Sequence, residues 1–230
     1  SATGAIASLA MTGLIAASVV GGSYWLQQQQ QPIDSYLIIN VSDSMRGSGQ
    51  LEELTQHVCK GMQDQTFTGD FLTVIPFADT SKVTHATAIQ NRMDVLGLCK
   101  EDKLFSLLDP QGVAKGEGTS LAETLERLQH QESNLSNAEK QNSVISILIH
   151  ADDQGTGAEN AIALKETAKR AEALLNDGTV LVFFAVDADL QRDLQAVLHH
   201  PRVKVSALSP ESIEATLLWA FSTARTSQGE

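Results

Sequence analysis

Cysteine and basic residues are scarce in this sequence, and each shortage excludes a class of protein. The two cysteines, Cys59 and Cys99, are too few for a disulfide framework. They fit either small buried apolar residues or one bridge, and the redox compartment stays open. The 16 Lys and Arg residues are outnumbered by 28 Asp and Glu residues, which gives a formal net charge of −12. Because such a surface repels a phosphate backbone, we expect no nucleic-acid partner.

The motifs of common catalytic and nucleotide-binding sites are also missing. The sequence has no Gly-x-Ser-x-Gly elbow, no Walker loop and no Gly-x-Gly-x-x-Gly fingerprint. The pair His199 and His200 precedes Pro201 in a predicted loop, and the sequence places no further zinc ligands beside it. We therefore expect no catalytic residue and a protein that is not an enzyme. The alternative is a metal-dependent hydrolase that uses Asp152.

Charge is absent from residues 4–26. An apolar helix of about 23 residues is long enough to cross a hydrocarbon core of about 30 Å. Tyr24 and Trp25 end the stretch, where aromatic rings favour the lipid–water interface. We predict a single-pass transmembrane anchor at residues 1–26, followed by a linker of glutamines and Pro32 at residues 27–34.

Small residues in the predicted anchor recur at every fourth position, as at Gly13, Ala17 and Gly21. This spacing lets helices approach closely in lipid, so it predicts docking against other membrane-complex subunits; the alternative is a lone anchor. No Lys or Arg flanks the anchor, and its orientation is therefore not fixed by the positive-inside rule. An acidic domain behind an uncleaved anchor favours the extracytoplasmic side.

The remainder, residues 35–226 with a short tail at 227–230, alternates between apolar runs and amphipathic segments. Predicted strands are 36–41, 71–77, 144–150, 180–186 and 203–206; predicted helices are 51–62, 121–128, 158–176, 190–198 and 210–223. Unbroken apolar runs are typical of strands covered on both faces. The sequence thus predicts an α/β fold, a doubly wound and mainly parallel sheet with helices on both faces. Pro76 predicts an edge position or an irregularity for the second strand.

Oxygen-bearing side chains cluster in three loops of this pattern. The groups are Asn40, Ser42, Asp43, Ser44 and Met45 after the first strand, Thr119 and Ser120 before the helix at 121, and Asp152 and Asp153 after the strand at 144–150. Doubly wound sheets place ligands at the carboxyl ends of their strands. Hydroxyl and carboxylate oxygens suit Mg²⁺.

The three loops together resemble the metal-ion-dependent adhesion site of von Willebrand factor A domains. The first resembles the Asp-x-Ser-x-Ser-Met segment of that site, the second its Gly-x-Gly-Thr-Ser-Leu segment and the third its strand-end aspartate segment. The resemblance covers residues 36–221. It implies a protein-binding domain in which Ser42, Ser44, Thr119, Asp152 and Asn40 hold Mg²⁺. The expected partner contacts are Asp43, Met45, Ser120 and Asp153.

Two departures from the family pattern leave alternatives open. The leading aspartate is Asn40 here, which removes a formal charge, and Asp43 stands between the two serines. The site carboxylate is Asp152 or Asp153, with Asp152 preferred. The first hypothesis is therefore a membrane-anchored protein-binding module with a divalent cation. The second is a structural subunit of a membrane protein complex, with a degenerate, metal-free site in which Asn40, Ser42 and Thr119 are turn and capping residues.

Overall fold

A computed structural model of the chain describes residues 32–41, 51–78, 81–108, 121–133, 142–149, 157–176, 179–185, 188–207 and 209–226. The chain divides into two units, Ser1–Gln31 and Pro32–Glu230. All described residues belong to the second unit. The predicted anchor lies outside them, and no helix among the described residues is long and apolar enough to cross a membrane.

The second unit is built on a six-stranded sheet in the order β3-β2-β1-β4-β5-β6. The strands are β1 (Ile33–Asn40), β2 (Phe71–Phe77), β3 (His85–Ala88), β4 (Asn142–Ile149), β5 (Val180–Ala185) and β6 (Val203–Ala207). All neighbouring pairs are parallel except β2 and β3. The mainly parallel sheet predicted from the apolar runs is confirmed, and each of its five predicted strands is present.

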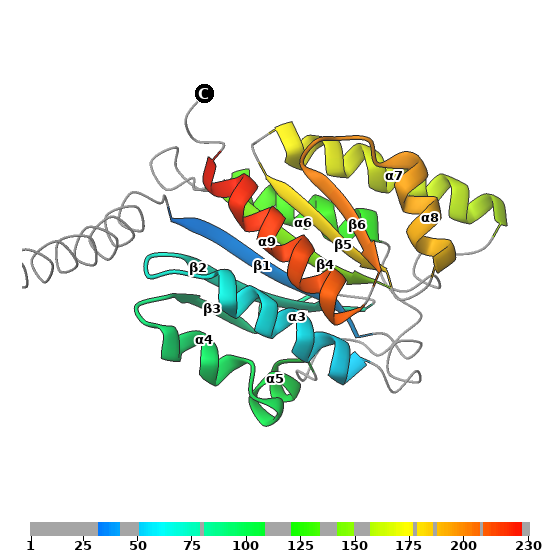
Figure 1. The fold of residues 1–230 in the computed structure, drawn as a ribbon. Helices are drawn as coiled ribbons and strands as arrows, with labels where there is room; N and C mark the ends of the chain where they lie inside the picture. The colour runs from blue at the N-terminus through cyan, green and yellow to red at the C-terminus, as the bar shows by residue number, and fades with distance from the viewer. Residues whose placement is uncertain are drawn as a thin grey trace, which may run out of the picture. The chain divides into compact units, whose positions relative to one another are not determined.

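Helices cover both faces of the sheet (Figure 1). They are α3 (Leu51–Gln65), α4 (Arg92–Leu98), α5 (Glu101–Leu108), α6 (Leu121–Ser133), α7 (Gly157–Asn176), α8 (Ala188–Val197) and α9 (Pro210–Thr226). Alternate residues of β1 separate two hydrophobic clusters, since Leu37 and Ile39 join α3 and α9 while Tyr36 and Ile38 join α6, α7 and α8. This alternation explains why residues 36–39 of β1 are apolar on both faces of the sheet.

The second strand is not at an edge, so the first of the two alternatives predicted for Pro76, an edge position, is wrong. β2 lies between β1 and β3, and β3 pairs only with Phe71 to Val74. The Pro76 carbonyl accepts from the Lys82 N–H at 3.3 Å, so the proline nitrogen faces the side of β3, beyond the end of that ladder. The missing N–H therefore removes no bond of the β2–β3 ladder. The hydrophobic pattern of the sequence did not predict β3, α4 or α5.

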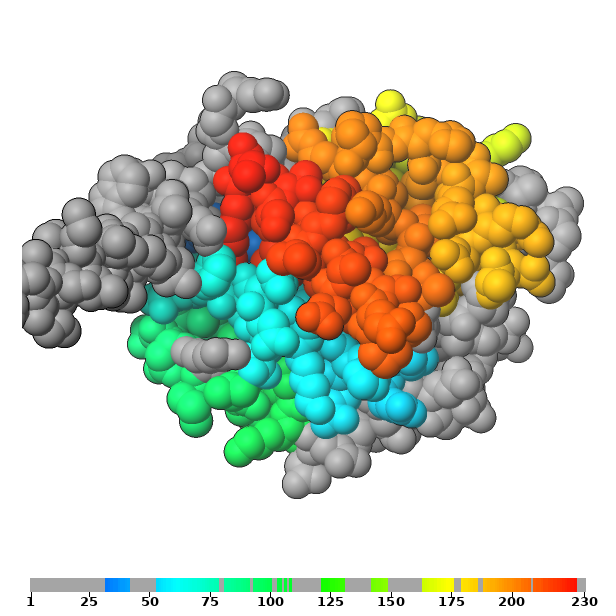
Figure 2. Space-filling model, in the orientation of Figure 1, coloured from blue at the N-terminus to red at the C-terminus, as the bar shows by residue number. Residues whose placement is uncertain are grey.

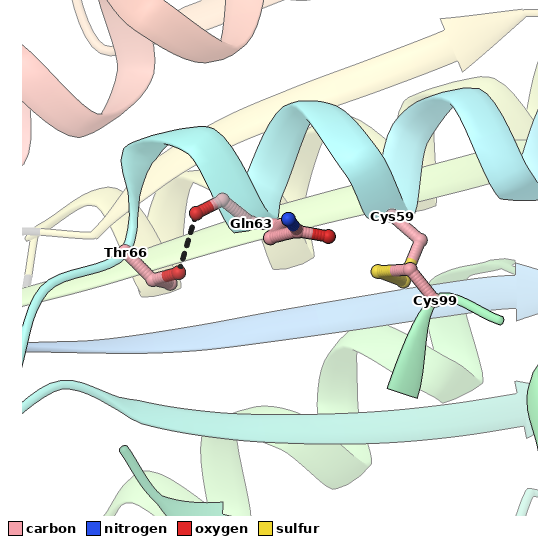
Figure 3. Close-up of a disulfide and its surroundings, with 4 residues drawn as sticks. All are labelled: Cys59, Gln63, Thr66 and Cys99. Atoms are coloured by element: carbon pink, nitrogen blue, oxygen red, sulfur yellow. Dashed lines mark hydrogen bonds between the residues drawn. A yellow bond between two sulfur atoms is a disulfide. The ribbon is translucent and has the colours of Figure 1, made fainter. Parts of the chain in front are cut away.

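A disulfide between Cys59 and Cys99 joins α3 to the end of α4, with the two Cα atoms 5.5 Å apart (Figure 3). Both cysteines are buried, at 2% and 4% exposure. The bridge settles the alternative that the sequence left open. It fixes the short helix α4, which follows the edge strand β3, to the long helix α3 on the same face of the sheet.

A buried ion pair ties the end of α9 to the start of the sheet. The Arg225 guanidinium donates to both oxygens of Asp70, at 3.0 and 2.6 Å, and also to the Gln65 carbonyl at 3.0 Å. Backbone N–H groups of Ile33 and Phe67 donate to the same carboxylate, at 3.0 and 2.8 Å. Asp70 is 0% exposed and Arg225 7% exposed, so both charges have left water and depend on these partners.

Helices α3 and α9 lie side by side, and their atoms meet along the face in Figure 2. Gly61 of α3 permits this approach, because a Cβ added there would stand 2.6 Å from Leu217 Cδ1 of α9. Leu217 is fully buried, so its side chain has no empty space to move into. Gly97 of α4 offers a contrast, with nothing within 4 Å of an added Cβ.

This contrast makes two glycine-to-alanine changes act in opposite directions. Gly97→Ala is expected to raise the free energy of unfolding by about 0.5–1 kcal/mol through helix propensity. Gly61→Ala gains the same propensity but forces α3 and α9 apart, and overpacking costs about 1–3 kcal/mol, so the net change is a loss. Urea unfolding of both variants measures the difference. Equal stabilisation by the two changes would contradict the close approach of the helices.

Candidate functional site

The carboxyl edge of the sheet is the candidate site, and Asn40 is its described residue. Asn40 is the last residue of β1, is 0% exposed and pairs in register with Phe77, the last residue of β2. By the alternation of β1, its side chain belongs to the face covered by α6 and α7. The structure therefore places the amide group in the buried layer at the carboxyl end of β1.

The topology brings the described residues that flank the other predicted loops to the same edge. β4 is parallel to β1, with Ile39 opposite Leu148, so β1 and β4 end beside each other, at Asn40 and Ile149. The helix α6 precedes β4 and leads back to the opposite edge, so its first residue, Leu121, begins at the carboxyl edge. Leu121 is fully buried in the cluster that also contains Phe77. The described residues next to the three predicted loops, Asn40, Leu121 and Ile149, therefore lie at one edge of the sheet.

The remaining predicted site residues lie outside the described part of the chain. These are Ser42, Asp43, Ser44, Met45, Thr119, Ser120, Asp152 and Asp153. Among the described residues, no group of three or more His, Cys, Asp or Glu side chains is placed to hold a metal ion. Their roles as ligands and as partner contacts therefore stay predictions.

The neutral side chain of Asn40 limits the affinity of this edge for a cation. Its neutral amide offers one oxygen to Mg²⁺ and no charge, in a position from which water is excluded. The predicted set of hydroxyls with one carboxylate suits a hard cation that keeps several waters, and it binds more weakly than a set with two carboxylates. The residues fit Mg²⁺ in kind, with one formal charge fewer than the resembled site.

Solved structures with a similar fold were found, whereas no protein-family model and no curated protein matches the sequence. A von Willebrand factor type A protein from Catenulispora acidiphila superposes with a TM-score of 0.55 at 14% identity over 84% of this chain. The protein BatB from Bacteroides thetaiotaomicron gives 0.58 at 13% identity over 84% of this chain and 100% of its own. The fold is that of a von Willebrand factor A domain.

Another structural neighbour is the pilus adhesin SpaC from Lactobacillus rhamnosus GG, with a TM-score of 0.53 and 13% identity over 84% of this chain. This chain spans 42% of the Catenulispora protein and 30% of the adhesin. At these identities the likeness establishes the fold. The functions of the longer proteins are theirs and are not shown for this chain.

At the opposite edge of the sheet, where β1 begins, the carboxyl group of Asp34 has a raised pKa. Asp34 follows Ile33 at the start of β1, close to the buried pair of Asp70 and Arg225. Burial, together with the negative charge of Asp70, raises the pKa of Asp34 from 3.8 to about 6. The folded chain binds this proton more tightly than the unfolded chain. The associated stabilisation is therefore complete below about pH 4 and is lost as the pH rises through about 6.

Asp34→Asn should remove this dependence on pH. The variant is expected to be more stable than the parent by about 1 kcal/mol at pH 7.5, where the parent carries a partly buried charge, and equal to it near pH 4. Urea unfolding at both pH values measures this. Asp189→Asn is the control, because the Asp189 side chain is 81% exposed on α8. A gain at pH 4 as large as that at pH 7.5 would contradict the assignment.

Proposed function

We propose that this chain is a non-enzymatic protein-binding module, held on the membrane by its first 26 residues, whose docking surface is the carboxyl edge of the sheet. The observation that carries the proposal is the position of Asn40, buried at the end of β1 beside the parallel strand β4. In the sequence, Ser42, Thr119 and Asp152 stand within about three residues of described residues at this edge. Mg²⁺ held there would be positively charged, and an acidic side chain of the partner could complete its coordination shell.

The disulfide supports an extracytoplasmic position for the domain. A buried bridge between Cys59 and Cys99 forms and persists in an oxidising compartment, and such bridges are rare in the reducing cytosol. The acidic composition after an uncleaved anchor points the same way. A domain outside the cytoplasm would meet its partners on the membrane surface or among neighbouring subunits.

Asn40→Asp tests whether the edge can hold a cation. The change places a carboxylate at a position of 0% exposure, which is expected to destabilise the chain by about 2 kcal/mol in EDTA. Millimolar Mg²⁺ should restore most of that loss, because an ion bound only to the folded state stabilises it. Thermal unfolding of the full chain in Mg²⁺ and in EDTA measures the effect.

Ser146→Asp provides a matched control for that experiment. Ser146 is also 0% exposed but lies inside β4, two residues before Leu148 and away from the strand end. A buried carboxylate there should cost stability equally with and without Mg²⁺. If the stability of the Asn40→Asp variant is also the same in Mg²⁺ and in EDTA, the edge holds no cation and the metal-dependent form of the proposal is wrong.

The second candidate function is that of a structural subunit in a membrane protein complex, and the neutral side chain of Asn40 favours it. Thr119→Ala separates the two. A module that docks through a cation should lose binding to its partners with this change and with EDTA alike. A structural subunit should co-purify with its complex after prolonged chelation, and Thr119→Ala should leave that association intact.

A further inference from the structure

A recess with a volume of about 400 Å³ lies between α7 and the segment that joins α8 to β6. Lys165 and Lys169 line one wall, and His199 and His200 line the other. Leu175 and Val203 are among its apolar lining residues. Its lining runs from the middle to the end of α7 and from the end of α8 to the first residue of β6, so the recess lies toward the edge of the sheet opposite Asn40.

The polar lining of the recess is biased toward hydrogen-bond donors and positive charge. Two lysines stand against one acid, Glu172, in a chain whose overall net charge is −12. Lys165, Lys169 and Glu172 are all exposed, and within the described residues no ion pair joins them. The two ammonium groups therefore remain available to a ligand, although water screens them.

Hydrogen bonds determine which ring nitrogens of the two histidines carry protons. His200 Nδ1 accepts from the Arg202 backbone N–H at 3.1 Å, so the ring proton is on Nε2. His199 Nε2 is 2.8 Å from the Ala196 carbonyl and must donate to it, which covers one carbonyl at the end of α8. His200 thus presents an N–H donor on the ring nitrogen that is not bonded to the backbone.

The geometry points to a second binding site, for an acidic peptide segment of a partner protein in which apolar side chains alternate with carboxylates. Lys165 and Lys169 would pair with the carboxylates, and the His200 ring would donate to one of them. The apolar side chains of the peptide would cover the floor formed by Leu175, Leu198 and Val203. A free carboxylate alone would leave that floor exposed to water.

Fluorescence anisotropy of the full chain in detergent solution tests this site with a dye-labelled peptide, acetyl-Glu-Leu-Glu-Leu-Glu-amide. Lys165→Glu combined with Lys169→Glu should weaken binding by about tenfold or more, because both ion pairs become repulsive. The matched control combines Lys60→Glu with Lys100→Glu, two exposed lysines on and beside other helices, with the same change in net charge. It should change binding by about twofold or less.

Two further peptides separate the contributions of charge and of the apolar floor. The Gln-Leu-Gln-Leu-Gln peptide should bind at least about tenfold more weakly, since it cannot form the ion pairs. The Glu-Ser-Glu-Ser-Glu peptide should also lose affinity, because it leaves the floor uncovered. Equal binding of either peptide and the parent peptide, or equal loss in the two double variants, would overturn the inference. The parent peptide should bind equally well in Mg²⁺ and in EDTA, so this site and the carboxyl edge can fail independently.

Discussion

Arg225→Met is expected to lower the free energy of unfolding by about 3–5 kcal/mol. The change removes the bidentate partner of Asp70, which is 0% exposed and keeps only the N–H donors of Ile33 and Phe67. A buried carboxylate with half of its partners cannot recover the hydration it lost on folding. Methionine fills a similar volume, so the loss reports the charge and its hydrogen bonds. Urea unfolding followed by Trp219 fluorescence measures it.

Arg192→Met is the matched control for this prediction. Arg192 of α8 also forms an ion pair, 3.0 Å from Asp189, but the two side chains are 70% and 81% exposed. An exposed pair contributes about 0–1 kcal/mol, so this variant should unfold almost like the parent. If the two variants lost equal amounts of unfolding free energy, the buried pair of Asp70 and Arg225 would contribute no more to stability than an exposed ion pair.

The strands of this fold were predictable because burial on both faces leaves an unbroken apolar run. Residues 180–185 are an example, since Val-Leu-Val-Phe-Phe-Ala is apolar throughout and all six residues are buried. The edge strand β3 has the sequence His-Ala-Thr-Ala and alternates between half-buried and exposed residues. Helices α4 and α5 have 7 and 8 residues, too short for a clear helical period. The elements that the sequence did not predict are thus a partly exposed strand and two short helices.

The candidate site was predictable in its order along the chain but not in its chemistry. Parallel strands must end at one edge, so the loops after Asn40 and Ile149 were bound to emerge together. Nothing local marks the pairing of Asp70 with Arg225, which are 155 residues apart. The sequence also has no local signal that Lys165 and His200 line one recess. They do so because α7 lies beside the segment that joins α8 to β6.

Replacing both Cys59 and Cys99 with alanine is expected to lower the free energy of unfolding by about 4 kcal/mol. The bridge closes a loop with a sequence separation of 40 residues, and a loop of that length restricts the unfolded chain by roughly this amount. Alanine fits both buried positions without adding a polar group. Urea unfolding of the double variant measures the loss.

Reduction of the parent chain provides the internal comparison for the double variant. In dithiothreitol the parent should lose the same stabilisation, while dithiothreitol should leave the variant unchanged, because the variant has no bridge to break. A parent that unfolds identically with and without dithiothreitol would contradict a contribution from the bridge. The disulfide contributes to stability only while the two cysteines are oxidised. The domain would therefore have its full stability in an oxidising compartment, where the bridge fixes α4, which follows the edge strand β3, to α3.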